Sequence, residues 1–248
     1  MQALELLQAH RYPEAIAACE RQLAENPGDW AAADTLASAL RAVGAYKEAL
    51  PLFERVAAYA QQNTPGDPGC ELDIACLHWC LDDWPRAIKL MRRLADGVLD
   101  RSINYGDLAG GVEQGLLLYY MGMTASDHEA VTYAVKYLKD RAKGRKIRFW
   151  PGPLARYYLG EFDFSEVLTA ATGKDTLAEA INAARGKLMS RRQLCGALFH
   201  DGVRRRAQGA EELCLARMRE CYALEDPLIE PEWYLARYEV KRADSAAL

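Results

Sequence analysis

The stretch from Leu36 to Phe53 decides the fold, and it reads LASALRAVGAYKEALPLF. Two amphipathic helical segments flank Gly44, and glycine is the residue that most readily ends a helix in a left-handed conformation. Ala37 and Ala49 place a small side chain in each segment, which would let the two helices approach closely. Tyr46 opens the second segment and would fill the space left by that approach. The stretch therefore predicts a tight pair of antiparallel helices.

Part of this pattern recurs on either side of the stretch. Tyr46–Leu50 (YKEAL) resembles Tyr12–Ile16 (YPEAI), 34 residues earlier, and Trp84–Ile88 (WPRAI), 38 residues later. The additional four residues of the second interval fall in Asn63–Gly69 (NTPGDPG), where an insertion costs little. Because one helix pair cannot bury its own apolar face, the copies must stack on one another.

A period of 34 residues is typical of the tetratricopeptide repeat, and the chain resembles that family in its motif residues as well. The second copy carries Leu36, Ala37, Leu40, Gly44, Tyr46, Ala49, Phe53 and Val56; the first carries Leu6, Tyr12, Ala15, Cys19 and Pro27; the third carries Ile74, Ala75, Trp84, Ala87, Met91 and Leu94. Asp82 stands where the family prefers glycine, which puts the geometry of the third turn in doubt.

Beyond residue 97 the repeat pattern weakens, but helical segments continue. We predict helices over residues 115–123, 129–142, 154–160, 164–171, 176–188, 192–208, 211–224 and 230–242, the last preceded by Pro227 and Pro231. Residues 102–111 read as a long connection or a broken helix, Trp150–Pro153 reads as a break, and alternating β patterns are absent. The sequence thus predicts an all-α solenoid of about 12–14 helices in antiparallel pairs. It comprises three repeats in residues 1–97, then divergent repeats and a closing helix in residues 98–248, as one continuous solenoid.

Composition excludes several classes of protein. Of the 248 residues, 50% are hydrophobic, and 31 Lys and Arg oppose 35 Asp and Glu, a net charge of −4. A general nucleic-acid coat protein would need a large cationic excess. The longest apolar run, Gly115–Met123, is far below the roughly 20 residues that span a bilayer. The N-terminus lacks the basic start and apolar core of a signal peptide, so we expect a cytoplasmic protein.

Neither the cysteines nor the histidines form a recognisable chemical site. The seven cysteines are expected to be reduced core residues, as fits a reducing compartment. Cys76 and Cys80 share one helical face with His78 between them, but the two further ligands of a zinc site are missing. No two histidines lie within five residues of each other. We therefore predict no metal, no cofactor and no catalytic residues.

Charge is unevenly distributed along the chain. Residues 1–100 carry 15 acids and 9 bases, a net of −6, whereas Lys136–Arg148 carries seven bases and one acid, Asp140. A second basic cluster comprises Arg185, Lys187, Arg191, Arg192, Arg204, Arg205 and Arg206. Either these clusters are solvated faces that pair with the acidic N-terminal half, or they bind an anionic partner, an acidic protein face or RNA. In the second case Phe149 and Trp150 could stack on a base.

The resemblance to the repeat family also points to a concave groove lined by certain first-helix positions. These positions correspond to Asp34, Ser38 and Arg41 in the second copy, and to Leu72, Cys76 and Trp79 in the third. Family members that bind a C-terminal carboxylate use Lys and Asn here, so this mode is disfavoured. Trp79 is either an exposed anchor for a partner or a core residue. The predicted partner-binding residues are Asp34, Ser38, Arg41, Trp79, Lys136, Lys139, Lys143, Arg145, Lys146 and Arg148.

Three C-terminal segments carry a second resemblance: Trp150–Pro153 (WPGP), Leu194–Phe199 (LCGALF) and Glu232–Glu239 (EWYLARYE). They are similar to bacterial repeat proteins that act as immunity proteins beside polymorphic or contact-dependent toxins. This resemblance implies a cytoplasmic, non-catalytic protein that neutralises a toxin, and the acidic N-terminal half would suit a cationic nuclease toxin. The alternatives are a housekeeping adaptor that joins two proteins and, less favoured, an RNA-binding helical protein.

Overall fold

The computed structural model describes residues 2–64, 68, 70–104, 108–225, 228 and 230–246. Within these residues every regular element is a helix, with fourteen α-helices, one short 3-10 helix and no strand. The predicted all-α fold of consecutive helix pairs is thereby confirmed.

The contacts within the chain define two compact units, Met1–Asn104 and Tyr105–Leu248. The expected division at residue 97, and the continuity of the chain as a single solenoid, stay predictions. Pro65, Gly66, Asp67 and Gly69 of the predicted loop lie outside the described residues, as do Tyr105–Asp107 and Pro227.

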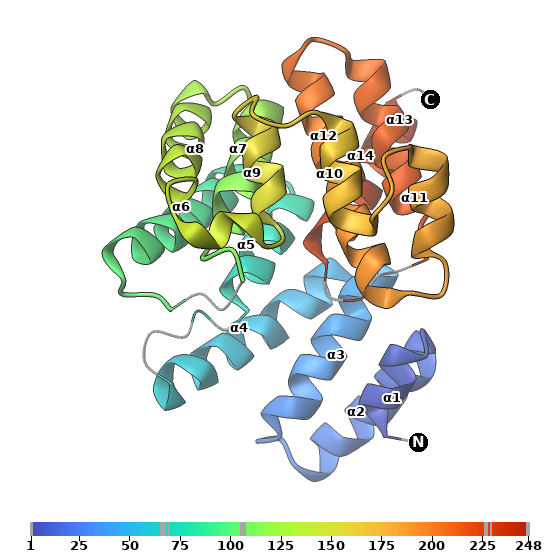
Figure 1. Cartoon of the computed structure of the whole chain (residues 1–248). Helices are drawn as coiled ribbons and strands as arrows, with labels where there is room; N and C mark the ends of the chain where they lie inside the picture. Colours follow the sequence, from blue (N-terminus) through green and yellow to red (C-terminus); the bar gives the residue numbers. More distant parts are fainter. Residues whose placement is uncertain are drawn as a thin grey trace. The chain divides into compact units, whose positions relative to one another are not determined.

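The first unit consists of three helix pairs, coloured blue to green in Figure 1. Their bounds are α1 (Ala3–Gln8), α2 (Tyr12–Glu25), α3 (Trp30–Val43), α4 (Tyr46–Asn63), α5 (Glu71–Cys80) and α6 (Trp84–Asp100). Each helix packs on the next along the chain, and α1 also contacts α3. Three helix pairs therefore occupy the positions that the spacing of 34 and 38 residues predicts.

The turn inside each pair has the same backbone conformation. His10, Gly44 and Asp82 occupy equivalent positions and have positive φ angles of 57°, 84° and 63°. The turn that was in doubt at Asp82 therefore has the geometry of its neighbours, although a side chain replaces the glycine. The geometry of the helix pair therefore requires a left-handed backbone conformation at this position, whether or not the residue is glycine.

Small and aromatic side chains form the core of the first unit as the repeat pattern predicts. Ala49 and Phe53 pack in one cluster with Ala37 and Leu77. Leu36 is buried as well, but in a separate cluster with Ala3 and Cys19. Leu36, Ala49 and Phe53 are thus all buried, but Leu36 lies in a different cluster because it faces the first pair, whereas Phe53 faces the third.

The second unit, green to red in Figure 1, is less regular. Its helices are α7 (Glu113–Ala125), α8 (His128–Arg141), the 3-10 helix η1 (Arg145–Arg148), α9 (Gly152–Tyr158), α10 (Phe164–Thr172), α11 (Leu177–Ala184), α12 (Leu188–Ala207), α13 (Glu211–Tyr222) and α14 (Pro231–Ala246). The α7 and α8 helices form a pair, whereas α12 packs against α7, α9, α10, α11, α13 and α14. The long α12 helix is thus the centre of this unit.

The predicted helix over residues 176–188 is too long. The α11 helix ends at Ala184, because Gly186 has a φ of 68° and separates it from α12. Among the described residues, no helix is both long enough and apolar enough to cross a membrane.

Candidate protein-binding surface

The predicted groove positions of α3 form a partly buried polar cluster. Arg41 is only 5% exposed, pairs with Asp73 of α5, and lies 5.4 Å from the centre of the Phe53 ring. Asp34 and Ser38 are half-buried. Burial raises the pKa of Asp34, as does the charge of Asp73, while Arg41 opposes the shift. Arg41 therefore joins two repeats, and only Asp34 and Ser38 keep accessible surface in the predicted groove.

Trp79 is a core residue. Its side chain has no exposed surface and stacks on Trp84, with ring centres 4.8 Å apart and planes 12° from parallel. The two stacked indoles join α5 to α6. An exposed anchor at Trp79 is therefore excluded, and the core alternative holds.

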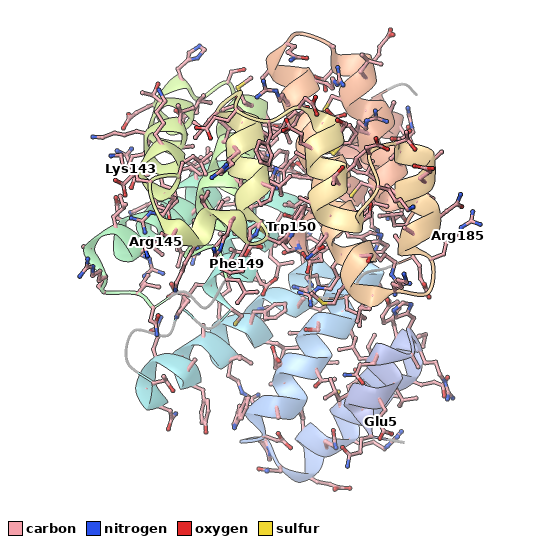
Figure 2. The ribbon with its side chains drawn as sticks, viewed as in Figure 1. Glu5, Lys143, Arg145, Phe149, Trp150 and Arg185 are labelled. Atoms are coloured by element: carbon pink, nitrogen blue, oxygen red, sulfur yellow. The ribbon has the colours of Figure 1, made fainter. Side chains whose placement is uncertain are left out.

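The predicted basic residues of α8 and η1 are all exposed. We call this surface the basic ridge; it comprises Lys136, Lys139, Lys143, Arg145, Lys146 and Arg148. Figure 2 shows Lys143 and Arg145 at the outer edge of the ribbon. The ridge is therefore the largest part of the predicted site that the fold leaves available to a partner.

The ridge is held in place by apolar residues on the opposite side of the same segment. Ala130, Ala134, Tyr137 and Leu138 of α8 are buried, and Asp127 caps the helix by accepting a hydrogen bond from the Ala130 amide at 3.0 Å. In η1, Ile147 is buried, and a methyl group added at Gly152 would meet its carbonyl oxygen at 1.9 Å. Gly152 thus permits the tight turn that presents the flanking cations to solvent.

Few acids oppose the ridge. Asp140 accepts a hydrogen bond from Arg141 at 2.7 Å and lies 3.4 Å from the Lys143 ammonium. The Arg141 hydrogen bond and the nearby cations hold the pKa of Asp140 below its usual range. Within the described part of the chain, no carboxylate lies within 4.0 Å of the remaining five ridge cations. Part of the ridge has a local role, since Lys139 lies in the last turn of α8, where a cation interacts favourably with the helix dipole.

The second basic cluster is different, because five of its seven side chains form ion pairs or a ring contact with residues of their own unit. Arg191 pairs with Glu225, Arg192 with Glu230, Arg205 with Asp201 at 3.3 Å, and Arg206 with Glu211 and Glu239; Arg204 lies over the Tyr157 ring. These acids lie in α12, α13, α14 and the turn before α14, not in the N-terminal half that the sequence suggested. Among the residues that the structure describes, Arg185 and Lys187 are the members of this cluster that are exposed and form no ion pair.

Phe149 and Trp150 do not form a paired platform for a base. Phe149 is 43% exposed, but the Arg148 guanidinium lies 4.8 Å from its ring centre. Trp150 is half-buried and faces Gly196, where an added methyl group would lie 3.2 Å from its ring. Only Phe149 therefore offers exposed aromatic surface at the end of the ridge.

A groove in the first unit escaped the sequence analysis. It consists of adjoining cavities of about 170 and 350 Å³, lined chiefly by Ala57, Gln61, Glu71, Ile74, Leu90 and Arg93. Ion pairs close its rims, with Arg93 2.7 Å from Glu71 and Arg86 3.6 Å from Glu54. The sequence pattern that could have indicated this groove is the spacing of Arg86, Lys89 and Arg93, because it places three cations on one face of α6. The acids beside them leave the groove with mixed charge.

A buried chain of hydrogen bonds in the second unit also escaped notice. The Tyr158 hydroxyl lies 2.7 Å from Nδ1 of His200, whose Nε2 lies 3.2 Å from Glu232. His200 has no exposed surface and Glu232 has 4%. Because helix packing encloses these groups, their evident effect is to join α9, α12 and α14.

The cysteines are buried thiols, as expected. All seven are free and buried, and Cys195 and Cys221 are in contact at 3.4 Å without being bonded. Burial raises the pKa of Cys19 to about 11 and those of Cys70 and Cys214 to about 12, so these groups stay protonated at neutral pH. Cys76, Cys80 and His78 are also buried, and His78 lies 3.3 Å from Asp83. In the part of the chain that the structure describes, no group of three or more potential metal ligands occurs.

Comparison with known families supports the repeat fold. Residues 6–66 match a family model described as Tetratricopeptide repeat. The matched residues span α1 to α4, so these helix pairs are similar to tetratricopeptide repeats, which suggests a module for protein–protein interaction. A search of curated proteins found no match, and a search of solved structures found none.

Proposed function

We propose that this chain is a non-catalytic protein-binding module whose main contact surface is the basic ridge. The observation that carries the proposal is the contrast between the two basic clusters. The ridge leaves five cations without a carboxylate partner in the described chain, whereas internal ion pairs and a ring contact occupy most of the second cluster. Exposed like charges repel one another, and an oppositely charged partner would relieve that repulsion.

A matched pair of double variants tests this surface. Lys143→Glu with Arg145→Glu reverses two ridge cations, and Arg185→Glu with Lys187→Glu makes the same change of charge elsewhere. All four side chains are exposed, and none lies inside an α-helix. We expect the first variant to lose the partners that the wild-type protein retains in an affinity purification, and the second to keep them. Equal recovery of those partners by both variants would place the contact surface elsewhere.

The finer role that we propose is that of an immunity protein that binds and neutralises a toxin in the cytoplasm. Its support is the resemblance carried by Trp150–Pro153, Leu194–Phe199 and Glu232–Glu239. These segments meet in the second unit, where Trp150 and Glu232 both approach Gly196 and Glu232 contacts His200. The residues that carry the resemblance are thus mainly core residues, which supports a common fold more than a common contact surface.

Co-expression tests the immunity role directly. We expect this protein to restore growth to cells that express the toxic domain encoded beside its own gene. The complex should be nanomolar or tighter, because an immunity protein must remain bound at low concentration. Absence of a neighbouring toxin gene, or failure to protect while the protein is present and folded, would contradict this role.

The alternative is an adaptor that joins two proteins. The observation in its favour is the uneven distribution of charge: the first unit, residues 1–104, holds 15 acids and 10 bases, a net of −5, whereas the segment Lys136–Arg148 of the second unit carries a net of +6. Each unit could then hold a partner of opposite charge. Two partners that bind at once with micromolar affinity would favour the adaptor, whereas one tight partner would favour the immunity protein.

A further inference from the structure

The basic ridge has a regular geometry that restricts what can bind to it. Lys136 and Lys139 lie in the last two turns of α8, and Lys143 follows in the next turn of the chain. Residues spaced i and i+3 share one helix face, so Lys136 and Lys139 lie on the same face of α8, and Lys143 lies two residues beyond the last residue of the helix, Arg141. Phe149, which directly follows Arg148 of the ridge, is a large apolar side chain with 43% of its surface exposed.

Single-stranded RNA fits this surface poorly. Sequence-tolerant binding of single strands combines cations with several aromatic rings on which successive bases stack. Here Arg148 lies over the Phe149 ring and Trp150 is half-buried beside Gly196. The ridge therefore supplies charge without the stacking platform.

An anionic membrane surface also fits poorly. A helix that lies in the membrane interface buries a continuous apolar face among the lipids. The apolar residues of α8 that could form such a face, Ala130, Ala134, Tyr137 and Leu138, are buried in the protein. Phe149 would then be the main apolar side chain available to insert into the membrane.

We infer that the ridge binds an acidic protein segment, which presents a row of carboxylates to Lys136, Lys139 and Lys143 and an apolar side chain to Phe149. A helix with acids at i and i+3 on one face matches Lys136 and Lys139 of α8, and the cations that follow α8 extend the contact: Lys143, Arg145, Lys146 and Arg148. This inference rests on the proposed function, since it names the chemistry of the partner at the same surface. The exposed positions of these cations mean that the attraction mainly speeds association and falls with added salt.

Defined probes test the inference with the full-length protein. The first probe is a labelled helical peptide of about 14 residues, or four turns, with Glu along one face and a single Leu. The second replaces each Glu by Gln, the third is a short single-stranded RNA, and the fourth is a vesicle of phosphatidylcholine with phosphatidylserine. Binding is measured at about 50 and 200 mM salt, where exposed charges are screened to different extents.

We expect the acidic peptide to bind more tightly than the other three probes. Lys143→Glu with Arg145→Glu should weaken that binding at least about tenfold, because two attractions become repulsions. The control Arg185→Glu with Lys187→Glu should leave it unchanged. Phe149→Ala should weaken binding of the peptide with Leu, and should have no further effect on a peptide in which Ala replaces this Leu.

Three results would overturn the inference. Tighter binding of the RNA or of the vesicle, abolished by the ridge variant, would show that the occupant is a nucleic acid or a lipid surface. An equal loss of peptide binding in both double variants would show that only net charge matters, and no peptide binding at all would exclude an acidic segment. If the protein partner from the affinity purification is still lost only in the ridge variant, the proposed function stands and the inference alone fails.

Discussion

Left-handed residues at the helix turns show how the fold acts on single residues. His10, Gly44 and Asp82 have positive φ in the first unit, and Ser126, Gly160 and Gly209 do so in the second. Only half of them are glycine, although a side chain in this conformation costs roughly 1–2 kcal/mol. Packing of the two flanking helices stabilises the turn enough to retain the strained residue.

Two substitutions in the second unit isolate this backbone strain. Ser126→Gly should raise the free energy of unfolding by about 1 kcal/mol, because it removes a left-handed side chain. Gly209→Ala should lower the free energy of unfolding by a similar amount. An added methyl group there meets no atom within 4 Å, so the only cost is the strain of a side chain at positive φ. Chemical denaturation followed by circular dichroism measures both. Unchanged midpoints in the two variants would show that these turns carry no strain.

At the scale of elements, two basic helices with similar sequence patterns have different surroundings. The α8 helix packs mainly on α7, so the cations of its outer face remain exposed. The α12 helix is surrounded by six others, and Arg204, Arg205 and Arg206 at its end find partners among the chain's own acids and rings. Whether a basic run becomes a surface or an internal network depends on how many helices surround it.

The packing of α3 on the first pair is tested by Leu36→Ala. Leu36 is 7% exposed and packs with Ala3 and Cys19, so the truncation should destabilise the protein by about 2–5 kcal/mol. Leu4→Ala is the matched control. Because Leu4 is 51% exposed, its truncation should lower the free energy of unfolding by less than about 0.5 kcal/mol. Thermal and urea unfolding give both values, and equal effects would contradict the assigned core.

The polar cluster between α3 and α5 predicts a pH dependence. The folded-state pKa of Asp34 is raised by burial and by Asp73, so the folded protein holds this proton more strongly than the unfolded chain. Stability is therefore lost as pH rises from the unfolded value, about 3.9, through the raised folded value. Asp34→Asn should stabilise the protein at neutral pH and have little effect below the unfolded pKa. A stability difference that is constant with pH would contradict this account.

At the scale of the molecule, the chain forms two compact units. The first contains three complete helix pairs, which is about the number that repeat proteins need to be stable. The fragment Met1–Asn104 should therefore fold alone into a helical domain that unfolds cooperatively. A fragment that shows little helix by circular dichroism, or melts without a transition, would mean that this unit depends on the rest of the chain.

The sequence by itself determined the class of fold and the first three repeats. The spacing of Tyr12, Tyr46 and Trp84 predicts the helix pairs correctly, because small and aromatic residues at fixed positions are a local requirement of each pair. Exposure of the ridge cations was also predictable, since a run of like charges is rarely buried.

Only the tertiary structure decided which side chains face inward where several helices meet. Trp79 and Arg41 lie at positions that the repeat family associates with a groove, yet Trp79 stacks on Trp84 and Arg41 pairs with Asp73, 32 residues further along the chain. Arg192 likewise pairs with Glu230, 38 residues away, and one of the two acids paired with Arg206, Glu239, lies 33 residues away. Such pairings depend on contacts between distant helices, whereas periodicity reports only the order of residues along one helix.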